Sequence, residues 1–555
     1  MNALVRHNGR FSTLKALGLL SCALTTAWLC SPAQALPVFS NAVSLGTVDI
    51  NALDEPSGLA ASRHNEGVLW THNDSGDTAR VFALDTHGRL LGTYKLPGVS
   101  QYDYEDIAIG PGPVTNVIYV HVGDIGDNFS VRANLKIYQF PEPAVYLRQV
   151  SSPPTFTIKG LRTLTLTYPD GARNAESLLV DPWSGDVFIA TKEPNISRIY
   201  MATKAQMDAG APITLSFVRE IDFDLATSGD LSPTGREIVL RQRNYARLWT
   251  RAPGQSVGAA LGGVPIPIPV VGRPAEINGE SIAFDALGRG YFTLSDYNVA
   301  QPLNYFGRSN DMARPPRVLV SAGATWRYLD TGTNLGTAWQ ASGYNDTAWR
   351  IGEGQFGYGD GAERTTVSFG PKSTSKFITT FFRKSFVVTN TAGVGRLDLK
   401  LVFDDGAGVY LNGTRIALVN LSSNATAATL ASAPQEDLED TWFTFAVNPA
   451  LLIAGTNTLA VEVHQVAANS PDLSFDAQLI AYESPPPPRI LSASSRTNGT
   501  FLLTFTGSAE SVTVEASVNF TTWSALGTAT LTNGNGAFLD MPAIWTPWRF
   551  YRLLQ

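Results

Sequence analysis

A short phrase recurs through the first half of this sequence: an acidic residue, a few apolar or small residues, and then a turn. Clear copies begin at Glu55, Glu105, Glu176 and Glu280, and a degenerate fifth copy begins at Thr227. The spacing is roughly fifty residues, with one longer unit, and self-similarity at that period is typical of propellers and solenoids. The sequence therefore predicts a repeat architecture in this part of the chain.

The residues that follow each phrase decide between those two architectures. Runs of β-branched and aromatic residues occur at Val68–Thr71, Val117–Val120 and Val187–Ala190, separated by Gly, Asn, Asp and Pro. This pattern is typical of short strands joined by turns. We therefore predict an all-β fold in which four-stranded antiparallel blades form a five-bladed β-propeller. Val43–Asp49 would supply the outer strand of the last blade. A six-bladed propeller is the alternative, because the long second unit has room for another blade.

The first 35 residues have the features of a secretory signal peptide. Three basic residues precede an apolar stretch at 16–30, and the small residues around Ala35 offer a cleavage site. We therefore expect a secreted protein, located outside the cell, on its surface or in the periplasm. Both cysteines, Cys22 and Cys30, lie in this segment. The mature chain would have no disulfide, so its stability would come from core burial or bound ions.

The charge balance excludes one class of partner. The chain has 41 Lys and Arg against 48 Asp and Glu, a net charge of −7, and loss of the signal peptide would make it more negative. Without a basic patch or tail, nucleic acid is not an expected partner. No later apolar run reaches the length of a membrane span. A small-molecule or polymeric ester or glycan ligand is compatible with this composition, and the oligomeric state is left open.

Changes in composition and in repeat content along the chain predict the domain boundaries. The repeats end near residue 317, a Trp-rich segment follows, and Pro485–Pro488 form a stiff proline linker. We predict a signal peptide at 1–35, a propeller at 36–317, a middle module at 318–484, the linker, and a small C-terminal β-sandwich at 489–555.

The middle module carries a specific set of motifs. They are Trp326-Arg-Tyr-Leu-Asp, Gly336-Thr-Ala-Trp, Tyr344-Asn-Asp-Thr-Ala-Trp, Phe356-Gly-Tyr-Gly-Asp-Gly, Phe403-Asp-Asp-Gly and Val461-Glu-Val-His. This set resembles the galactose-binding-like β-sandwich modules, which implies a jelly-roll accessory domain of a kind often associated with carbohydrate. The tryptophans would mostly be core anchors, although one could be a sugar-stacking platform. Asp404 and Asp405 fit a turn better than a metal site. The alternating C-terminal residues resemble small immunoglobulin-like end domains.

The predicted propeller would gather many carboxylates on one face. The innermost strand of a blade starts on the face where the second strand ends, so the four phrase glutamates would lie near the polar residues that end the second strands. Crowded carboxylates repel each other, and a hard divalent cation such as calcium neutralises them. The predicted metal ligands are Glu55, Glu105, Glu176, Glu280, Asp124 and Asp127. Alternatively, the glutamates accept backbone amides and hold neighbouring blades together.

Two motifs carry a further resemblance. Glu280-Ser-Ile-Ala-Phe-Asp and Asp181-Pro-Trp-Ser-Gly-Asp resemble segments of phytase-like and strictosidine-synthase-like propellers. This resemblance implies a calcium ion at the channel mouth and hydrolysis of phosphate esters or lactones. The predicted catalytic residues are His72 as a base, with Lys192, Arg241 and Arg243 holding an anionic group. The leading prediction is therefore a metal-assisted ester or phosphoester hydrolase. The alternatives are a non-catalytic extracellular binding or scaffold propeller, and a carbohydrate-directed protein that docks through the middle sandwich.

Overall fold

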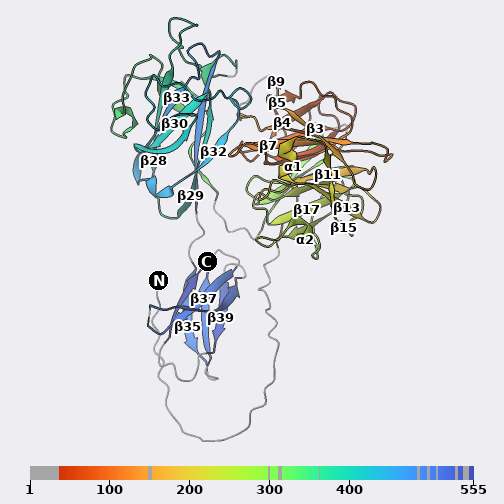
Figure 1. Ribbon diagram of the computed structural model, residues 1–555. Helices are drawn as coiled ribbons and strands as arrows, with labels where there is room; N and C mark the ends of the chain where they lie inside the picture. Colours follow the sequence, from red (N-terminus) through yellow and green to blue (C-terminus); the bar gives the residue numbers. More distant parts are fainter. Residues whose placement is uncertain are drawn as a thin grey trace, which may run out of the picture. The chain divides into compact units, whose positions relative to one another are not determined.

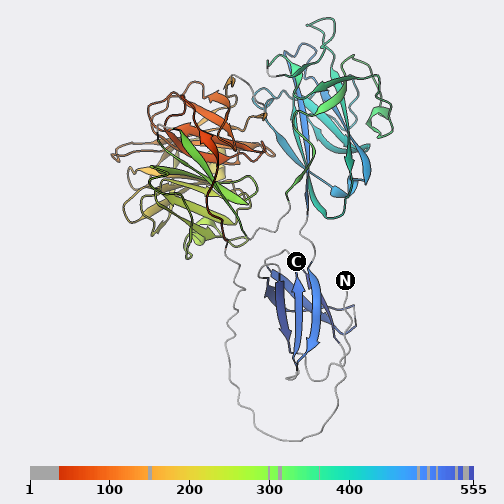
Figure 2. The same cartoon turned by 180° about the vertical axis from the view of Figure 1, so that it is seen from behind.

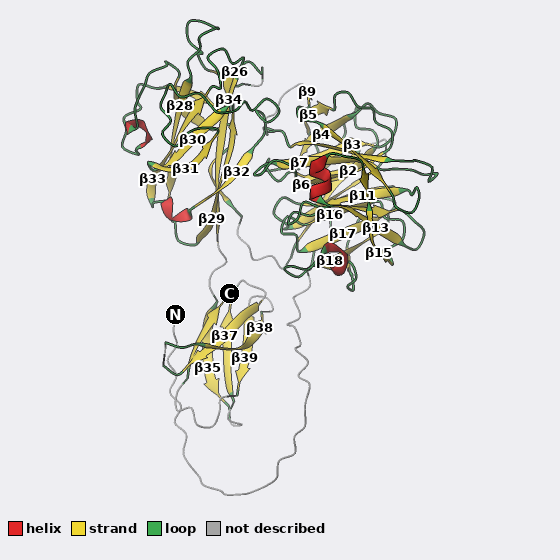
Figure 3. Cartoon of the chain, in the orientation of Figure 1, coloured by secondary structure: helices red, strands yellow, loops and turns green. Residues whose placement is uncertain are grey.

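The computed structural model is all-β, with only a few short helices (Figure 3). It describes residues 37–554 apart from 148–152, 298–299, 310–314, 362, 484–487, 497–499, 508–510, 520, 532–534 and 542–548. The predicted signal peptide and most of the proline linker therefore lie outside the described residues. No helix among the described residues is long and apolar enough to cross a membrane. The chain divides into two compact units, one formed by Val38–Ser309 with Pro316–Tyr482 and the other containing the residues after Tyr482.

Residues 38–309, here called the five-sheet domain, form five separate sheets (Figures 1 and 2). The first contains β2 (Pro56–Ala61), β3 (Val68–Asn73), β4 (Arg80–Asp85), β5 (Leu90–Lys95) and β9 (Thr155–Thr157). The second contains β6 (Tyr104–Pro111), β7 (Ile118–Asp124), β8 (Leu135–Pro141), β10 (Arg162–Thr167) and β14 (Ile213–Thr214). The third contains β11 (Ala175–Val180), β12 (Val187–Thr191), β13 (Ser197–Ala202) and β15 (Ser216–Ile221). The fourth contains β16 (Ser228–Leu231), β17 (Glu237–Gln242), β18 (Tyr245–Thr250) and β19 (Ile266–Ile268). The fifth contains β20 (Gly279–Phe284), β21 (Gly290–Ser295), β22 (Gln301–Gly307) and β1 (Val43–Val48).

The first strands of these sheets are neighbours in a closed cycle. Their order is β2, β6, β11, β16 and β20, and β20 lies beside β2 again. Five apolar clusters join each sheet to the next, including one that joins the fifth sheet to the first. The N-terminal strand β1 pairs antiparallel with β22 at the outside of the fifth sheet. The apolar residues that alternate along the strands are thus buried between sheets.

The long second repeat unit does not form a sheet of its own. It adds β9, which pairs parallel with β5, and β10, which pairs antiparallel with β8. A later strand, β14, pairs parallel with β10. The first two sheets therefore have five strands each, and the expectation of four antiparallel strands was wrong for them. Two short helices, α1 (Lys204–Ala209) and α2 (Val257–Ala260), lie in connections, and a capping box of Thr203 and Gln206 starts α1.

Two six-stranded sheets form the sandwich that follows. One contains β23 (Arg317–Val320), β26 (Phe356–Tyr358), β27 (Thr365–Thr366), β29 (Val394–Phe403), β32 (Phe443–Val447) and β34 (Leu473–Glu483). The other contains β24 (Thr325–Leu329), β25 (Arg350–Glu353), β28 (Thr379–Val388), β30 (Gly406–Leu411), β31 (Thr414–Val419) and β33 (Gly455–His464). Short 3-10 turns are η1 (Ala338–Gln340) and η2 (Pro449–Leu451).

Aromatic side chains fill the space between the two sheets of the sandwich. Phe382 stacks on Phe475 with ring centroids 4.0 Å apart, and Trp326 meets Phe475 edge-on. Trp339 and Trp349 belong to a second, smaller cluster. All three of these tryptophans are buried. None of them can act as an exposed sugar-stacking platform, so they are core anchors.

Buried polar contacts join the sandwich to the five-sheet domain within their common compact unit. The indole Nε1 of Trp442 donates to Oδ1 of Asn65 at 3.0 Å, and the Lys400 ammonium donates to the His64 carbonyl oxygen at 2.8 Å. All four residues are buried. A buried polar contact of this kind is costly to leave unpaired, so it favours one arrangement of the two parts.

The C-terminal unit has a small core of its own. One sheet contains β35 (Arg489–Ser495), β36 (Phe501–Thr506) and β39 (Asn535–Asp540), and the other contains β37 (Ser511–Ser517), β38 (Ser524–Thr530) and β40 (Phe550–Leu554). Alternate residues of β36 and β37 are buried together, as the alternating sequence predicts.

Candidate metal centre

Three of the phrase glutamates lie at irregularities in their strand pairs. The pairing register shifts between Tyr104 and Asp106 and again at the corresponding points around Glu176 and Glu280. A bulge leaves one residue out of the ladder and re-aims its side chain. Glu105, Glu176 and Glu280 are each only 4–5% exposed. Glu55 differs, because it precedes β2 and is exposed.

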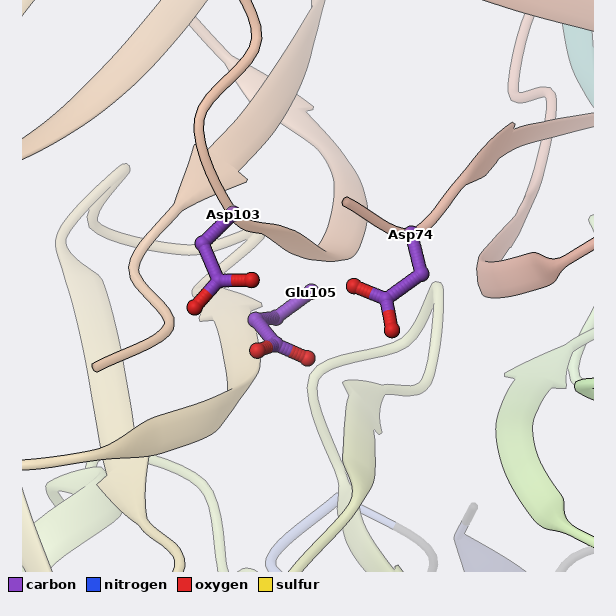
Figure 4. Close-up of side chains that lie close together, drawn as sticks. All are labelled: Asp74, Asp103 and Glu105. Atoms are coloured by element: carbon purple, nitrogen blue, oxygen red, sulfur yellow. The ribbon is translucent and has the colours of Figure 1, made fainter. Parts of the chain in front are cut away.

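A compact acidic cluster lies where the first two sheets meet. Asp74 follows β3, Asp103 precedes β6, and Glu105 lies in β6. One carboxylate oxygen from each residue lies within 4.8 Å of the other two. Figure 4 shows the three carboxyl groups gathered around a common space. Such oxygens are the ligands that a hard divalent cation prefers.

Burial and mutual repulsion make the charged form of this cluster unfavourable. Burial, together with the charges of Asp103, Glu280 and Glu55, raises the pKa of Asp74 to about 6. Burial, and then the charges of Glu176 and Asp74, raise the pKa of Glu105 well above its usual value. Without a cation, some of these carboxyl groups must hold protons near neutral pH.

The Glu105 side chain lies close to Asp103 and to the backbone of Gly126. Its residue is 4% exposed, and its carboxylate accepts no hydrogen bond from the described residues. Gly126 lies directly against it: a Cβ added there would be 2.2 Å from Oε1 of Glu105 and 2.4 Å from Oδ2 of Asp103. Because glycine has no side chain, the two carboxyl groups fit against residue 126.

The cluster of Asp74, Asp103 and Glu105, together with Glu176, Glu280 and Asp296, is here called the acidic face. Residues directly after the second strands supply the other charges on it. Lys192, after β12, forms an ion pair with Glu176, and Arg243, after β17, places Nη2 2.7 Å from Oε1 of Glu280. Burial raises the pKa of Glu176 to about 7, although the Lys192 charge opposes this shift. Asp296 follows β21, and burial together with Glu280 raises its pKa to about 8.

Asp124, the last residue of β7, and Asp127, which follows it, were predicted as metal ligands but have protein partners. Arg132 places Nη2 2.7 Å from Oδ1 of Asp124. The backbone N–H of Arg132 donates to Oδ2 of Asp127 at 2.8 Å. Both aspartates are buried. Their metal-binding role stays a prediction, and these contacts do not favour it.

Two predicted catalytic residues lie inside the domain and do not reach the acidic face. His72 is fully buried in β3 with Nδ1 2.8 Å from the Asn73 carbonyl oxygen, and burial lowers its pKa to about 4. Arg241 is fully buried in β17, where it forms an ion pair with Glu276 and donates to the Ser281 carbonyl oxygen at 2.8 Å. This placement does not support the base and anion-binding roles predicted for them.

Sequence reasoning missed the residue that holds the first strands together. Asp106 is fully buried, and its Oδ2 accepts the backbone N–H groups of Leu178 in β11 at 2.9 Å and of Gly229 in β16 at 3.2 Å. The role of joining neighbouring sheets was considered for the glutamates. In the second sheet it belongs to the residue after the glutamate. Asp103 was also missed, and the only signal for it was its position two residues before Glu105.

Comparisons with known proteins give little further information. No family model matches the chain, and no curated protein matches it. Among solved structures, a β-glucuronidase from Bacteroides uniformis is 16% identical, with 43% of this chain and 30% of that chain covered and a TM-score of 0.22. A β-glucuronidase from Bifidobacterium dentium, complexed with coumarin-3-O-glucuronide, is 13% identical over 44% of this chain and 46% of that chain, with a TM-score of 0.22. The chain spans less than half the length of either protein, and similarity this low establishes neither a shared fold nor a shared activity.

Proposed function

We propose that the five-sheet domain is a five-bladed β-propeller whose acidic face binds a divalent cation, calcium being the best fit. Five sheets with first strands in a closed cycle, and a terminal strand in the last sheet, support the propeller assignment. The cation would be held by Asp74, Asp103 and Glu105. Glu176, Glu280 and Glu55 would surround this site and increase its negative charge.

One observation carries the metal proposal: carboxylate oxygens of Asp74, Asp103 and Glu105 lie within 4.8 Å of one another, although their charges repel. A buried carboxylate normally accepts hydrogen bonds or pairs with a cation, because its desolvation is otherwise uncompensated. The Lys192 ammonium, whose charge lowers the pKa of Glu105, forms its ion pair with Glu176. Oxygens within 4.8 Å of one another suit an ion with ligand distances of about 2.3–2.6 Å.

Calcium titration of the full chain tests this site. We expect calcium to raise the unfolding temperature of the five-sheet domain in wild-type protein, and Asp103→Asn to abolish most of that rise. Asp222→Asn is the matched control, because Asp222 is an exposed aspartate of the same domain. An equal calcium effect in wild type and Asp103→Asn would contradict the proposal.

Metal-assisted ester hydrolysis is a second candidate function for the same face. It is favoured by Glu176, which has a pKa of about 7 and could exchange a proton near neutral pH. The phosphoester form of this hypothesis has less support, because Lys192 and Arg243 are already paired with glutamates. A panel of carboxylate, lactone and phosphate esters, compared between wild type and Glu176→Gln, tests it. Calcium binding without turnover of any ester would leave a non-catalytic binding or scaffold propeller.

We assign residues 1–35 as a signal peptide of a secreted protein, with domains at 36–317, 318–484 and 489–555. The two packed sheets of the sandwich support a galactose-binding-like jelly roll, and the C-terminal sheets support an immunoglobulin-like end domain. N-terminal sequencing of exported protein tests the cleavage site. Binding to a glycan array tests whether the middle sandwich is directed to carbohydrate.

A further inference from the structure

A second group of acidic side chains lies in the sandwich. Asp360 follows β26, Glu439 lies before β32, and Asp472 immediately precedes β34. One carboxylate oxygen from each lies within 4.8 Å of the others. Asp404 and Asp405, in the turn between β29 and β30, adjoin this group. Three loops and one tight turn, distant in sequence, thus bring their acids to one place.

Asp404 is an independent sign that this group lacks a partner. The residue is 2% exposed, and its Oδ2 is buried without a hydrogen-bond partner among the described residues. The carboxyl groups of Asp405 and Asp472 lie beside it. A buried carboxyl oxygen without a donor carries its full desolvation penalty. The sequence motif Phe403-Asp-Asp-Gly was interpreted as turn chemistry, and a turn alone does not explain this oxygen.

The positive charge beside these acids is too small to balance them. Lys159 of the five-sheet domain forms an ion pair with Glu439, and its Nζ lies 3.5 Å from Oδ1 of Asp360 and 3.6 Å from Oδ2 of Asp440. Its side chain is 41% exposed, so it approaches from the solvent side. Lys376 donates to the carbonyl oxygens of Ser470 and Pro471, and its charge also interacts with Asp472. Two ammonium groups therefore face five acids, and the ion pairs of Lys159 do not include Asp404 or Asp472.

We infer that the sandwich binds a divalent cation of the calcium class between Asp360, Glu439 and Asp472, beside the buried carboxyl group of Asp404. The separation of the carboxylate oxygens matches ligand distances of about 2.3–2.6 Å around one ion. The ion places a positive charge near Asp404, and the Lys159 ammonium competes with the ion for Glu439. This site uses none of the residues of the propeller face and does not depend on the function proposed above.

Equilibrium dialysis of the full chain against calcium, with bound metal counted in single and double variants, tests the site. We expect Asp103→Asn to retain an ion that is lost when Asp472→Asn is added. We also expect Glu439→Gln to weaken this binding at least tenfold, while Glu436→Gln, an exposed glutamate in the same loop, leaves it unchanged. If the site at Asp74, Asp103 and Glu105 does not bind calcium, Asp103→Asn will bind as much calcium as wild type, and the effects of Asp472→Asn and Glu439→Gln will be unchanged. If Asp472→Asn and Glu439→Gln bind as much calcium as wild type, the inference is overturned.

Lys159→Met provides a test that does not remove any ligand. Because the ammonium competes with the ion, its removal is expected to tighten calcium binding at the sandwich roughly tenfold, given the strength of a charge–charge interaction near a protein surface. If Lys159 were instead the only cation of the cluster, the variant would lose thermal stability and gain no calcium affinity. That result would also overturn the inference.

Discussion

Glu105 and Asp106 are adjacent in β6, yet they belong to two very different regions. Glu105 lies on the acidic face among like charges, and its carboxylate accepts no hydrogen bond from the described residues. Asp106 lies inside the cycle of first strands and accepts backbone N–H groups from two other sheets. Both are buried. The comparison teaches that burial alone does not reveal the role of an acid: the donors that reach it separate a structural acid from a candidate ligand.

The largest expected effect concerns Asp106. Asp106→Ala would leave the N–H groups of Leu178 and Gly229 buried without an acceptor, at about 1–3 kcal/mol each. We expect the five-sheet domain to lose roughly 3 kcal/mol of unfolding free energy, with or without calcium. Chemical denaturation followed by tryptophan fluorescence measures this loss. A change as small as that of the exposed control Asp222→Asn would remove the distinction between the two acids.

Calcium should stabilise the protein by binding at Glu105, and Asp106 should take no part in that gain. At a concentration a hundred times its Kd, calcium is expected to add about 2.7 kcal/mol to wild-type stability. Glu105→Gln should lose this gain. In the absence of metal, however, it should be more stable than wild type by about 1 kcal/mol, or 2–4 °C in Tm, because like-charge repulsion is relieved. Differential scanning calorimetry with calcium and with chelator separates the two effects. A metal-free Glu105→Gln less stable than wild type would show that the side chain is structural.

The pH dependence of the metal-free protein sharpens the comparison. The pKa values of Asp74, Glu176 and Asp296 are raised to about 6, 7 and 8, so the folded state binds more protons than the unfolded state above pH 4. Their contribution to stability is therefore present below about pH 4 and is lost as pH rises towards 8. Tm measured from pH 4 to 8 tests this. Saturating calcium should flatten the curve, and an unchanged slope with calcium would argue against a metal on this face.

The smallest effect is expected for Arg243. Its side chain is 41% exposed, so its ion pair with Glu280 is screened by solvent, and Arg243→Met should change stability by no more than about 1 kcal/mol. Removal of a positive charge should instead tighten calcium binding a few-fold. Isothermal titration of Arg243→Met beside wild type measures this. Weaker calcium binding in the variant would mean that Arg243 organises the site.

The strand pattern predicted much of the all-β fold, but not which polar residues reach the face. Asp74, Lys192, Arg243 and Asp296 are each the first residue after a second strand, and all of them lie on the acidic face. His72 and Arg241 lie two residues earlier, within the strands, and are buried between sheets. A strand boundary was known from sequence only to within a few residues. Because of that uncertainty, the buried His72 and Arg241 were predicted to share a site with Lys192 and Arg243, which do lie on the acidic face.

The cluster in the sandwich could not be found in the same way. The phrase glutamates recur at equivalent positions, so one copy predicts where the others lie. Asp360, Asp404, Glu439 and Asp472 occur once each, in loops whose meeting depends on the packing of both sheets. No periodicity links them. Asp103 was missed for the same reason, because it lies in a loop that no other repeat copies.

The pairing of β1 with β22 has a kinetic consequence. Val43 lies opposite Tyr305, so the last sheet of the domain cannot be completed until nearly the whole domain has been synthesised. Contacts between residues so far apart in sequence slow folding, because a long loop must close before the contact forms. Until then the inner strands of the fifth sheet lack their outermost neighbour, and the unfinished domain presents an unpaired strand edge of the kind that other chains can join.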